Sequence, residues 1–516
     1  MKSYERDTEA LARLNEHYGR AFTFEDVRAE IWRRVYAFRE RSSRAPQNLL
    51  DLSEARRMVA QDAGFGRWGA LMKAAETGTP PPGAAFMIDA KENRIGARRR
   101  MSATEWDDLT AVMRERRITR LDAEGLMTGA AFERIATLDH VTTLSLGGSR
   151  ELTDDGLAHL ARMPQLEVLN LSEYPGGRFT NRGLEVLRHL PNLRKFEMTW
   201  QSGIIDAGVS NLQYCDRLEQ VNLMGSPTGD GAIAALQGKP NLRDFSSGRL
   251  VIDAGLPLLH NFPLMKNAVN AARLLIDGPF TNDGLACLAG LEGVNELDLF
   301  WHVTGITTGA FAHLIHLPNL VSLGCDGKLS DDRAMRHIGE LPRLRKLRAQ
   351  ESVATDDGFE ALSRSTTLEG FWGRVCPNFG SRGFAAFSKM PALRSLGVGC
   401  KNVDDRALST LPHFPSLREL TPIGMSDDAF RHVGRCESLH RLTCMYCRDT
   451  TDIATEHIAG LPLNYFYAGL TQITDRSLAI LGGMLSLEQV ELYECNGSPT
   501  RVCRSWRACR AGAKSI

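Results

Sequence analysis

Apolar residues recur along the chain with a spacing far longer than the period of a helix or a strand. Fifteen apolar positions follow one another from Ile135 to Leu481, at intervals of about 25 residues. They are Ile135, Leu160, Leu187, Leu212, Leu236, Leu259, Leu288, Leu314, Ile338, Leu362, Phe387, Leu411, Val433, Ile458 and Leu481. A repeat of this length predicts a small unit whose copies stack side by side, because one copy alone cannot bury both of its apolar faces.

Each repeat combines a helix pattern with a strand pattern. The segment TDDGLAHLARMPQLEVLNL begins at Thr153, and related segments begin at Thr180, Thr281, Thr355 and Ile473. Its first half places apolar residues three and four positions apart, which predicts a helix, and its proline discourages further helix. Its second half has the form L-x-x-L-x-L, which predicts a short strand. Each unit is therefore expected to contain a helix, a short loop and a strand.

Acidic pairs recur at the predicted helix starts. They are Asp154-Asp155, Asp331-Asp332, Asp356-Asp357, Asp404-Asp405 and Asp427-Asp428. Paired carboxylates can act in acid–base catalysis. The same pair in repeat after repeat is typical of helix caps instead, because carboxylates accept hydrogen bonds from the free N–H groups of a helix N-terminus. We interpret these pairs as structural.

The repeats resemble the leucine-rich repeat superfamily, and most closely its cysteine-containing, ribonuclease-inhibitor-like subtype. The resemblance covers residues 104–495 and rests on the T-D-x-G-L helix start and on Cys215 and Cys436, which precede L-x-x-L strands. It implies an α/β fold, a leucine-rich repeat solenoid with a curved parallel sheet on the concave side and a full helix per repeat on the convex side. Residues 52–76 also resemble the helical module that precedes ankyrin or leucine-rich repeats in some bacterial proteins, which implies a bacterial source.

Changes in pattern divide the chain into five segments. Residues 1–78 lack the repeat and predict a small N-terminal helical domain that serves as a cap or a docking module. Residues 79–86 contain three consecutive prolines and predict a stiff linker. Residues 87–127 predict a lead-in strand and a capping first helix, and residues 128–497 predict the array of about 15 repeats. Residues 498–516 form an irregular basic tail.

The tail does not continue the repeat. A further repeat is due after the last strand pattern, yet SPTRVCRSWRACRAGAKSI is basic and unpatterned. Residues 498–516, back-translated with GC-rich codons and read one base earlier, become VTDAGVPFLAGLPRRGEVD, in which threonine and leucine fall where a repeat requires them. We therefore interpret the tail as an out-of-frame version of a lost repeat, a hypothesis that sequencing of the coding DNA tests.

Charge and composition exclude several classes of protein. The 62 basic and 62 acidic residues cancel, so no net charge attracts nucleic acid or anionic membrane. The sequence has neither a run of about eighteen apolar residues nor an apolar signal-peptide core near its start, so we expect no membrane association and no secretion. Eleven cysteines scattered through the chain do not resemble a disulfide framework. These features predict a cytoplasmic protein.

No motif in the chain predicts catalysis. The patterns G-x-S-x-G and H-E-x-x-H and the phosphate-binding P-loop are absent. Cys444 and Cys447 form a C-x-x-C, but no second pair completes a zinc site. The repeat register places Cys447, Cys376 and Cys495 at turn positions, where the resemblance implies stacked hydrogen-bonding side chains. We expect structural thiols, no cofactor, no metal and no enzymatic activity.

Nucleic acid and small molecules are not the expected ligands. Arginines gather at residues 98–100 and 114–117, and such a cluster could contact nucleic acid. No aromatic residues are interleaved with it and no recognised binding module accompanies it, so we interpret it as a solvated helix face. The long sheet that the repeats predict suits a macromolecule better than a metabolite.

The exposed face of the predicted sheet carries the candidate binding residues. Side chains that flank the apolar strand positions point away from the core, because side chains alternate along a strand. The candidates are Phe300, Lys346, Arg348, Trp372, Arg374, Tyr465, Tyr467 and Tyr493. The pattern also predicts an acidic patch at Glu296 and Asp298, separate from a basic patch around Trp372. Trp, Tyr and Arg are the residue types that anchor protein interfaces.

These observations predict a non-enzymatic scaffold that binds a protein on the concave face of the repeats. The alternative is a substrate-receptor adaptor, in which the repeats select a target and the N-terminal helices recruit an effector. The adaptor hypothesis has less support, because the chain shows no F-box-like motif of the kind that accompanies cysteine-containing repeats in F-box proteins.

Overall fold

The computed structural model describes residues 8–18, 23–24, 27, 55–57, 60, 67–77, 83–172, 179–269, 271–493 and 495. The chain divides into two compact units. Unit 1 contains the residues up to Val294 together with Trp301–Gly305, and unit 2 contains Asn295–Phe300 and the residues from Ile306 onward. All eight candidate binding residues belong to unit 2.

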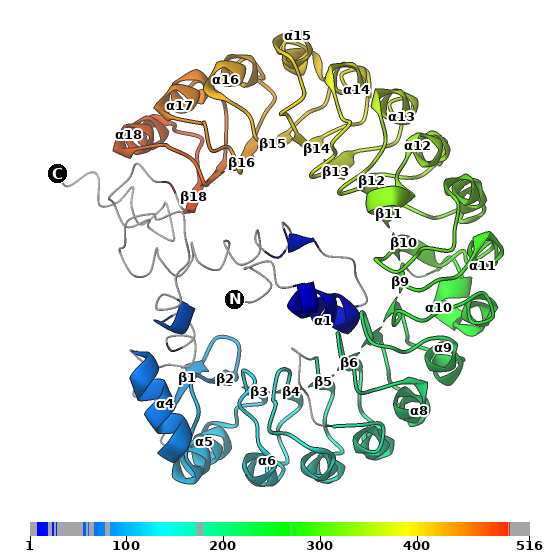
Figure 1. The fold of residues 1–516 in the computed structure, drawn as a ribbon, viewed down its shortest axis with the longest axis vertical. Coiled ribbons are helices and arrows are strands. Elements are labelled where there is room, and N and C mark those ends of the chain that lie inside the picture. Colours follow the sequence, from blue (N-terminus) through cyan, green and yellow to red (C-terminus); the bar gives the residue numbers. More distant parts are fainter. Residues whose placement is uncertain are drawn as a thin grey trace. The chain divides into compact units, whose positions relative to one another are not determined.

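Unit 1 alternates strands with short helical segments (Figure 1). Its strands are β1 (Phe86–Asp89), β2 (Arg94–Ala97), β3 (Arg120–Asp122), β4 (Thr143–Ser145), β5 (Val168–Asn170), β6 (Lys195–Glu197), β7 (Gln220–Asn222), β8 (Asp244–Ser246) and β9 (Ala272–Ile276). Its helical segments, with 3-10 helices labelled η, are α1 (Thr8–Tyr18), α4 (Trp68–Thr77), α5 (Ala103–Arg116), α6 (Gly129–Ile135), α7 (Asp154–Leu157), η2 (Ala158–Arg162), η3 (Gly183–His189), α8 (Asp206–Val209), η4 (Ser210–Tyr214), α9 (Asp230–Leu236), η5 (Leu256–Asn261), α10 (Pro263–Lys266) and α11 (Asn282–Ala286).

Unit 2 has the same alternation. Its strands are β10 (Val294–Leu299, whose first residue belongs to unit 1), β11 (Ser322–Cys325), β12 (Lys346–Arg348), β13 (Gly370–Gly373), β14 (Ser395–Gly399), β15 (Glu419–Ile423), β16 (Arg441–Met445), β17 (Tyr465–Gly469) and β18 (Gln489–Tyr493). Its helical segments are η6 (Thr308–His316), η7 (Gly327–Leu329), α12 (Asp332–Gly339), α13 (Asp356–Leu362), α14 (Ser381–Phe387), α15 (Asp405–Leu408), η8 (Leu411–His413), α16 (Asp427–Val433), α17 (Asp452–Ile458) and α18 (Asp475–Gly483).

Each unit is a leucine-rich repeat solenoid, as the sequence predicts. Strands β2 to β9 in unit 1 and β10 to β18 in unit 2 pair in parallel with their neighbours. Within the repeats of each unit, the strands line one side and the helices from α5 onward line the other (Figure 1). All fifteen apolar positions of the predicted repeat are at most 1% exposed, so the period seen in the sequence is the period of the core.

A full α-helix is expected in every repeat, but the structure has one in only some of them. Several repeats begin with one α-helical turn and continue as a 3-10 helix, as α7 does into η2, and others contain only a 3-10 segment such as η3. A 3-10 helix rises further per residue than an α-helix, so it spans the convex side of a repeat with fewer residues. The apolar side chain still reaches the core, because Leu160 in η2 and Leu187 in η3 are fully buried.

The expected lead-in strand is part of a hairpin at the start of the array. Strand β1 pairs antiparallel with β2, and β2 pairs in parallel with β3. Asn93 closes the turn with a positive φ of 48°, a conformation that asparagine tolerates well. The expected first helix is α5, whose N-terminus has a capping box formed by Ser102 and Glu105.

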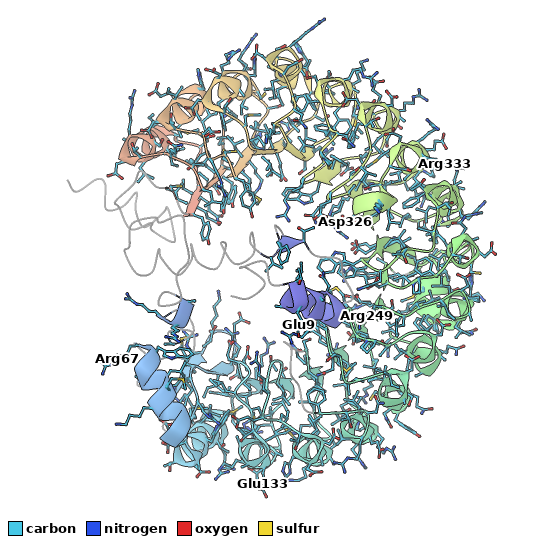
Figure 2. All side chains as sticks on the ribbon, viewed as in Figure 1. Glu9, Arg67, Glu133, Arg249, Asp326 and Arg333 are labelled. Carbon is cyan, nitrogen blue, oxygen red and sulfur yellow. The ribbon has the colours of Figure 1, made fainter. Side chains whose placement is uncertain are left out.

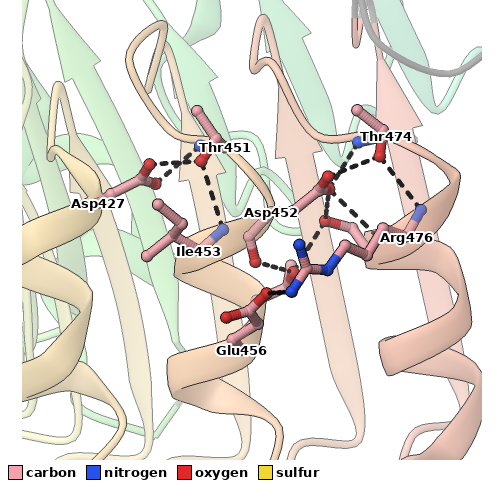
Figure 3. A network of polar contacts seen from close by, with 9 residues as sticks. Asp427, Thr451, Asp452, Ile453, Glu456, Thr474 and Arg476 are labelled. Carbon is pink, nitrogen blue, oxygen red and sulfur yellow. Dashed lines mark hydrogen bonds and ion pairs between the residues drawn. The ribbon is translucent and has the colours of Figure 1, made fainter.

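An aspartate in one repeat accepts hydrogen bonds from a threonine in the next (Figure 3). Asp427 Oδ1 accepts from Thr451 N at 2.7 Å and its Oδ2 accepts from Thr451 Oγ1 at 2.5 Å. Asp452 makes the same two bonds with Thr474, at 2.8 and 2.6 Å. The arrangement recurs at Asp154–Thr180, Asp253–Thr281 and Asp332–Thr355. We call these contacts the Asp–Thr links.

The links refine the expected role of the acidic pairs. Asp331 and Asp404 cap their own helices, as predicted. In the pairs at Asp154, Asp356 and Asp427, however, the first carboxylate accepts backbone N–H groups of the following repeat. Helices α7 and α13 are capped by the threonine that precedes the pair, whose hydroxyl accepts an N–H of the same helix. These aspartates therefore join repeats.

Several predicted segments lie partly or wholly outside the described residues. They are the basic tail at 498–516 with its proposed out-of-frame origin, half of the linker at 79–86, and most of the N-terminal domain at 1–78. Within that domain the structure describes α1, α4 and a small apolar cluster in which Ala70 and Leu71 pack against buried Ala60.

Candidate protein-binding face

Parallel pairing aligns the exposed side chains of unit 2 into rows that run across the strands. The first row contains Glu296, Ser322, Lys346, Gly370, Ser395, Glu419, Arg441, Tyr465 and Gln489. The second contains Asp298, Gly324, Arg348, Trp372, Gly397, Thr421, Thr443, Tyr467 and Glu491. Phe300, Arg374 and Tyr493 stand two residues beyond the second row. We call this surface the strand face of unit 2.

The structure places the predicted residues in two groups on this face. Lys346, Arg348, Trp372 and Arg374 lie on and just beyond the neighbouring strands β12 and β13, and we call them the Trp372 group. Tyr465, Tyr467 and Tyr493 lie on β17 and β18 and form the tyrosine group. Strands β14, β15 and β16 separate the two groups, and Phe300 follows β10. Lys346 is exposed, and the other candidates are half-buried.

Arg348 is bound by two carboxylates, which corrects the expected separation of acidic and basic patches. Its Nη2 donates to Asp298 Oδ1 at 2.8 Å, and its Nη1 donates to Asp326 Oδ2. Asp326 Oδ1 also accepts from the backbone N–H of Gln350 at 2.9 Å. Asp326 lies on the strand side of unit 2, whereas Arg333 lies on its helical side (Figure 2). Arg348, Asp298 and Asp326 therefore form one ion-paired cluster.

A glycine makes room for this cluster. Asp298, Gly324 and Arg348 are register partners on β10, β11 and β12, so the ion pair passes over the middle strand. A Cβ on Gly324 would lie 1.9 Å from Asp298 Oδ1 and 2.4 Å from Arg348 Nη2. Burial lowers the pKa of Arg348, but its hydrogen bonds and the charges of Asp298 and Asp326 outweigh burial and raise it overall. Arg348 therefore stays charged.

Trp372 lies against the neighbouring strand. A Cβ on Gly397, its register partner on β14, would come within 2.2 Å of the indole Cε3. On the opposite face of β13, Phe371 belongs to a packed core in which its ring centroid lies 5.3 Å from that of Phe387. Phe359 contacts both of these rings at 5.9 and 6.0 Å. The indole is therefore a half-buried apolar surface on a rigid support.

In the tyrosine group, Tyr465 contacts the guanidinium of Arg441, and Tyr467 is partly buried. The guanidinium carbon of Arg441 lies 4.1 Å from the ring centroid of Tyr465, a distance at which a cation–π attraction is favourable. Arg441 Nε also lies 3.6 Å from Glu419 Oε1 on the next strand. Burial and the nearby Tyr465 raise the pKa of Tyr467 to about 12. Tyr467 is therefore neutral at physiological pH.

The cysteines occupy structural positions, as predicted. Cys376 Sγ lies 3.5 Å from Ala349 O, Cys447 Sγ lies 2.9 Å from Pro422 O, and Cys495 Sγ lies 3.4 Å from Ala468 O, so each thiol donates to the preceding repeat. Cys444 is buried in the core, and burial raises the pKa of its thiol well above the usual value. Among the described residues, no group of three or more His, Cys, Asp and Glu side chains is arranged to hold a metal ion.

The arginine cluster near the start of the array is largely engaged within unit 1. Arg99 Nη2 lies 2.6 Å from Glu105 Oε1, and Arg100 pairs with Glu151. Arg114 Nη2 donates to Thr137 Oγ1 at 3.1 Å. Across the part of the chain that the structure describes, no helix is both long and apolar enough to cross a membrane.

Comparison with solved structures finds similar chains at low sequence identity. No family model matches the chain. The complex of TLR13 with ssRNA13 has a TM-score of 0.51 and 15% identity, over 82% of this chain and 65% of that chain. A chain of the yeast Rad7 and Elc1 complex has a TM-score of 0.38 and 16% identity, over 78% of this chain and 86% of that chain. A leucine-rich repeat protein from Leptospira interrogans has a TM-score of 0.37 and 14% identity, over 73% and 89%. This chain thus spans less than two thirds of the TLR13 chain.

Sequence reasoning missed the residues that shape the face. Gly324 and Gly397 carry no side chain, so a search for binding chemistry passes over them, although their positions in the second row were available from the repeat register. Arg441 is an exposed residue of β16, and its contact with Tyr465 depends on the register between β16 and β17.

Proposed function

We propose that the protein is a non-enzymatic scaffold that binds another protein on the strand face of unit 2. One observation carries the proposal: Trp372, half-buried on this face, lies across Gly397 above a core of packed phenylalanines. A large side chain held in one position loses little conformational entropy on binding, and Trp is the residue type most enriched at energetic centres of protein interfaces.

The other candidates have distinct parts in this proposal. Trp372 and the tyrosine group supply apolar area, and Lys346 supplies a charge at the rim. Arg348 keeps the face in shape, because both carboxylates that it holds belong to neighbouring strands. The buried cysteines are free thiols, which supports a reducing, cytoplasmic compartment. Residues that could recruit an effector for the adaptor alternative lie mostly outside the described part of the chain.

The test is affinity capture on immobilised full-length protein from a lysate of the source cells. We expect Trp372→Ala to reduce a specifically captured protein at least about tenfold, since removal of a central Trp typically costs 2 kcal/mol or more. Arg333→Ala, on the helical side, is the matched control and should capture as the wild type does. Circular dichroism and the thermal midpoint should be unchanged in both variants. If Trp372→Ala retains every captured protein at wild-type levels, the binding face lies elsewhere.

A further inference from the structure

Two arginines of the Trp372 group differ in how their charges are satisfied. Arg348 donates to Asp298 and to Asp326. Arg374, just beyond the next strand, is half-buried, and its Nε is buried without a hydrogen-bond partner. Neither an ion pair nor a hydrogen bond satisfies its guanidinium among the described residues. A buried donor without a partner is rare in folded proteins and costs free energy.

The surroundings of Arg374 leave its outer end available to a partner. The paired residues of β13 and β14 end at Gly373 and Val398, and continuing that register by one residue brings Arg374 level with Gly399. A Cβ on Gly399 would meet no atom within 4 Å. Trp372 stands two residues earlier on the same face, because strand side chains alternate. With Nε buried, an incoming group approaches the two Nη atoms end-on. A carboxylate matches that fork with two parallel, charge-assisted hydrogen bonds.

Covering this residue constrains the partner. A partner that seals Trp372 also removes water from the guanidinium beside it. Desolvation of a charge is strongly unfavourable unless an opposite charge or good acceptors replace the water. An apolar partner surface is therefore disfavoured at this position, and an acidic side chain is favoured. Arg348 does not need an acidic partner residue, because Asp298 and Asp326 of the same chain already accept its hydrogen bonds.

We infer that Arg374 is the carboxylate-binding position of the strand face, and that the partner is an acidic protein segment with an Asp or Glu beside an apolar residue that covers Trp372. The inference rests on the proposed function and specifies the chemistry of the partner. A protein segment is favoured over single-stranded RNA because the face is not basic overall. Its acidic residues are Glu296, Asp298, Asp326, Glu419 and Glu491, and its basic residues are Lys346, Arg348, Arg374 and Arg441. Binding to a phosphate backbone draws on many unpaired cations at once.

The experiment selects binders from a phage-displayed library of random linear peptides on immobilised full-length protein. Enriched peptides are synthesised, and their affinities are measured by fluorescence anisotropy. We expect the peptides to share an acidic residue next to an apolar one. Arg374→Gln should weaken them at least about tenfold, because truncation of one partner of a buried charge pair is expensive. Arg374→Lys, which keeps the charge and loses the fork, should fall between the two. Arg406→Gln, an exposed arginine on α15, is the matched control and should bind normally.

A double-mutant cycle isolates the pair. The acidic residue of the peptide is changed to its amide and combined with Arg374→Gln. If the two groups contact each other, the double change weakens binding little more than either change alone. Additive losses would overturn the inference. So would the absence of enriched peptides, or wild-type affinity in Arg374→Gln with an unchanged thermal midpoint.

Two further outcomes separate this inference from the proposed function. If Trp372→Ala weakens peptide binding and Arg374→Gln does not, Arg374 is not the carboxylate-binding position, and the proposed binding face still stands. If neither substitution weakens peptide binding, both this inference and the proposed function are refuted. A single-stranded RNA oligonucleotide serves as the competing probe, because TLR13, which shares the fold, was solved with ssRNA13. RNA binding that depends on Arg374 and falls steeply with salt, without peptide binding, would overturn the acidic-segment inference.

Discussion

At the scale of single residues, the strand face is shaped by side chains that are absent as much as by those that are present. Gly324 leaves the space through which Arg348 reaches Asp298, and Gly397 leaves the space that the Trp372 indole occupies. Such positions matter because a closely packed surface has no spare volume into which neighbours can retreat. The neighbouring strands offer a direct comparison, since Gly399 on β14 meets open space.

The first prediction compares two glycine substitutions in unit 2. Gly324→Ala should lower the free energy of unfolding by about 2–3 kcal/mol, because the new methyl group displaces Asp298 or Arg348 from a partly buried ion pair. Gly399→Ala should change it by less than about 1 kcal/mol, because nothing stands in the way of its methyl group. Urea unfolding followed by circular dichroism measures both. Equal effects of the two substitutions would show that strand propensity, and not the ion pair, decides the outcome.

At the scale of elements, the repeats are held in register by polar contacts between neighbours in addition to the core. The Asp–Thr links satisfy N–H groups at the start of the next helical segment, which otherwise have no partner within the helix. In one repeat Arg476 also pairs with Glu456 of the preceding helix, beside the Asp452–Thr474 link (Figure 3). A short helical segment therefore depends on its neighbour for its first turn.

The second prediction uses the acidic pair on α16. Asp427→Ala should destabilise the protein by about 1–3 kcal/mol, because it removes the acceptor of the Thr451 N–H and hydroxyl. Asp428→Ala is the matched control, since Asp428 is exposed and its carboxylate takes no part in a link, and it should cost less than about 0.5 kcal/mol. Thermal unfolding of the two variants checks the difference. Similar losses would mean that both carboxylates act only through the positive end of their own helix.

The third prediction concerns pH and the first helix of the array. The hydrogen bond and charge of Arg99, together with Ser102, lower the pKa of Glu105 from 4.5 to about 2. Because this pKa is lower in the folded state, the stabilisation is complete above pH 4.5 and is lost as pH falls towards 2. Glu105→Gln keeps a side chain that can complete the capping box and removes the charge. It should be less stable than the wild type by about 1–2 kcal/mol at pH 7.

The stability of the two proteins should converge as the pH falls through that window. Thermal midpoints measured across the range give the result. Glu115→Gln, an exposed change on the same helix, should follow the wild type at every pH. A constant difference between Glu105→Gln and wild type would show that the carboxylate charge is not the cause.

At the scale of the whole molecule, the period of the core was available from the sequence, whereas the contacts that cross repeats were not. The fifteen apolar positions are set by a local rule that each repeat obeys separately, so the sequence alone was sufficient to find them. The Arg348 ion pair joins residues 50 positions apart, and the Asp427 link joins residues 24 positions apart. From the sequence alone, Asp298 could be a solvated strand residue and Asp427 a cap of its own helix. Only the register between neighbouring repeats shows that each bonds to another repeat.

The hairpin at β1 and β2 and the 3-10 segments were missed for a related reason. The apolar spacing of η3 suits an α-helix equally well, and the first strand of the hairpin carries no apolar repeat of its own. Because side chains alternate along each strand, the sequence was sufficient to place the candidate residues on one face of the sheet. Their part in binding stays a prediction. Only the structure shows that the Arg348 guanidinium has hydrogen-bond partners and that Arg374 Nε has none.

The fourth prediction follows from the charge balance of the chain. With 62 basic and 62 acidic residues, no long-range field accelerates association. For a peptide selected on the strand face, we expect the association rate to change by less than about threefold between 0.05 and 0.5 M salt. The affinity should fall only by the amount expected when salt screens the one ion pair between Arg374 and the peptide carboxylate. Surface plasmon resonance across this salt range measures both quantities. A loss of several orders of magnitude in affinity would show that the face binds through many unpaired cations.

The Asp–Thr links carry a consequence for how such an array changes length during evolution. A tandem duplication that copies a whole repeat brings one donor threonine and one acceptor aspartate with it. Both new junctions are then completed at once, wherever between two linked repeats the copy is inserted. A duplication of only part of a repeat leaves one junction without its acceptor and shifts the apolar period as well. Growth by complete units is therefore the change that the protein tolerates without further substitutions.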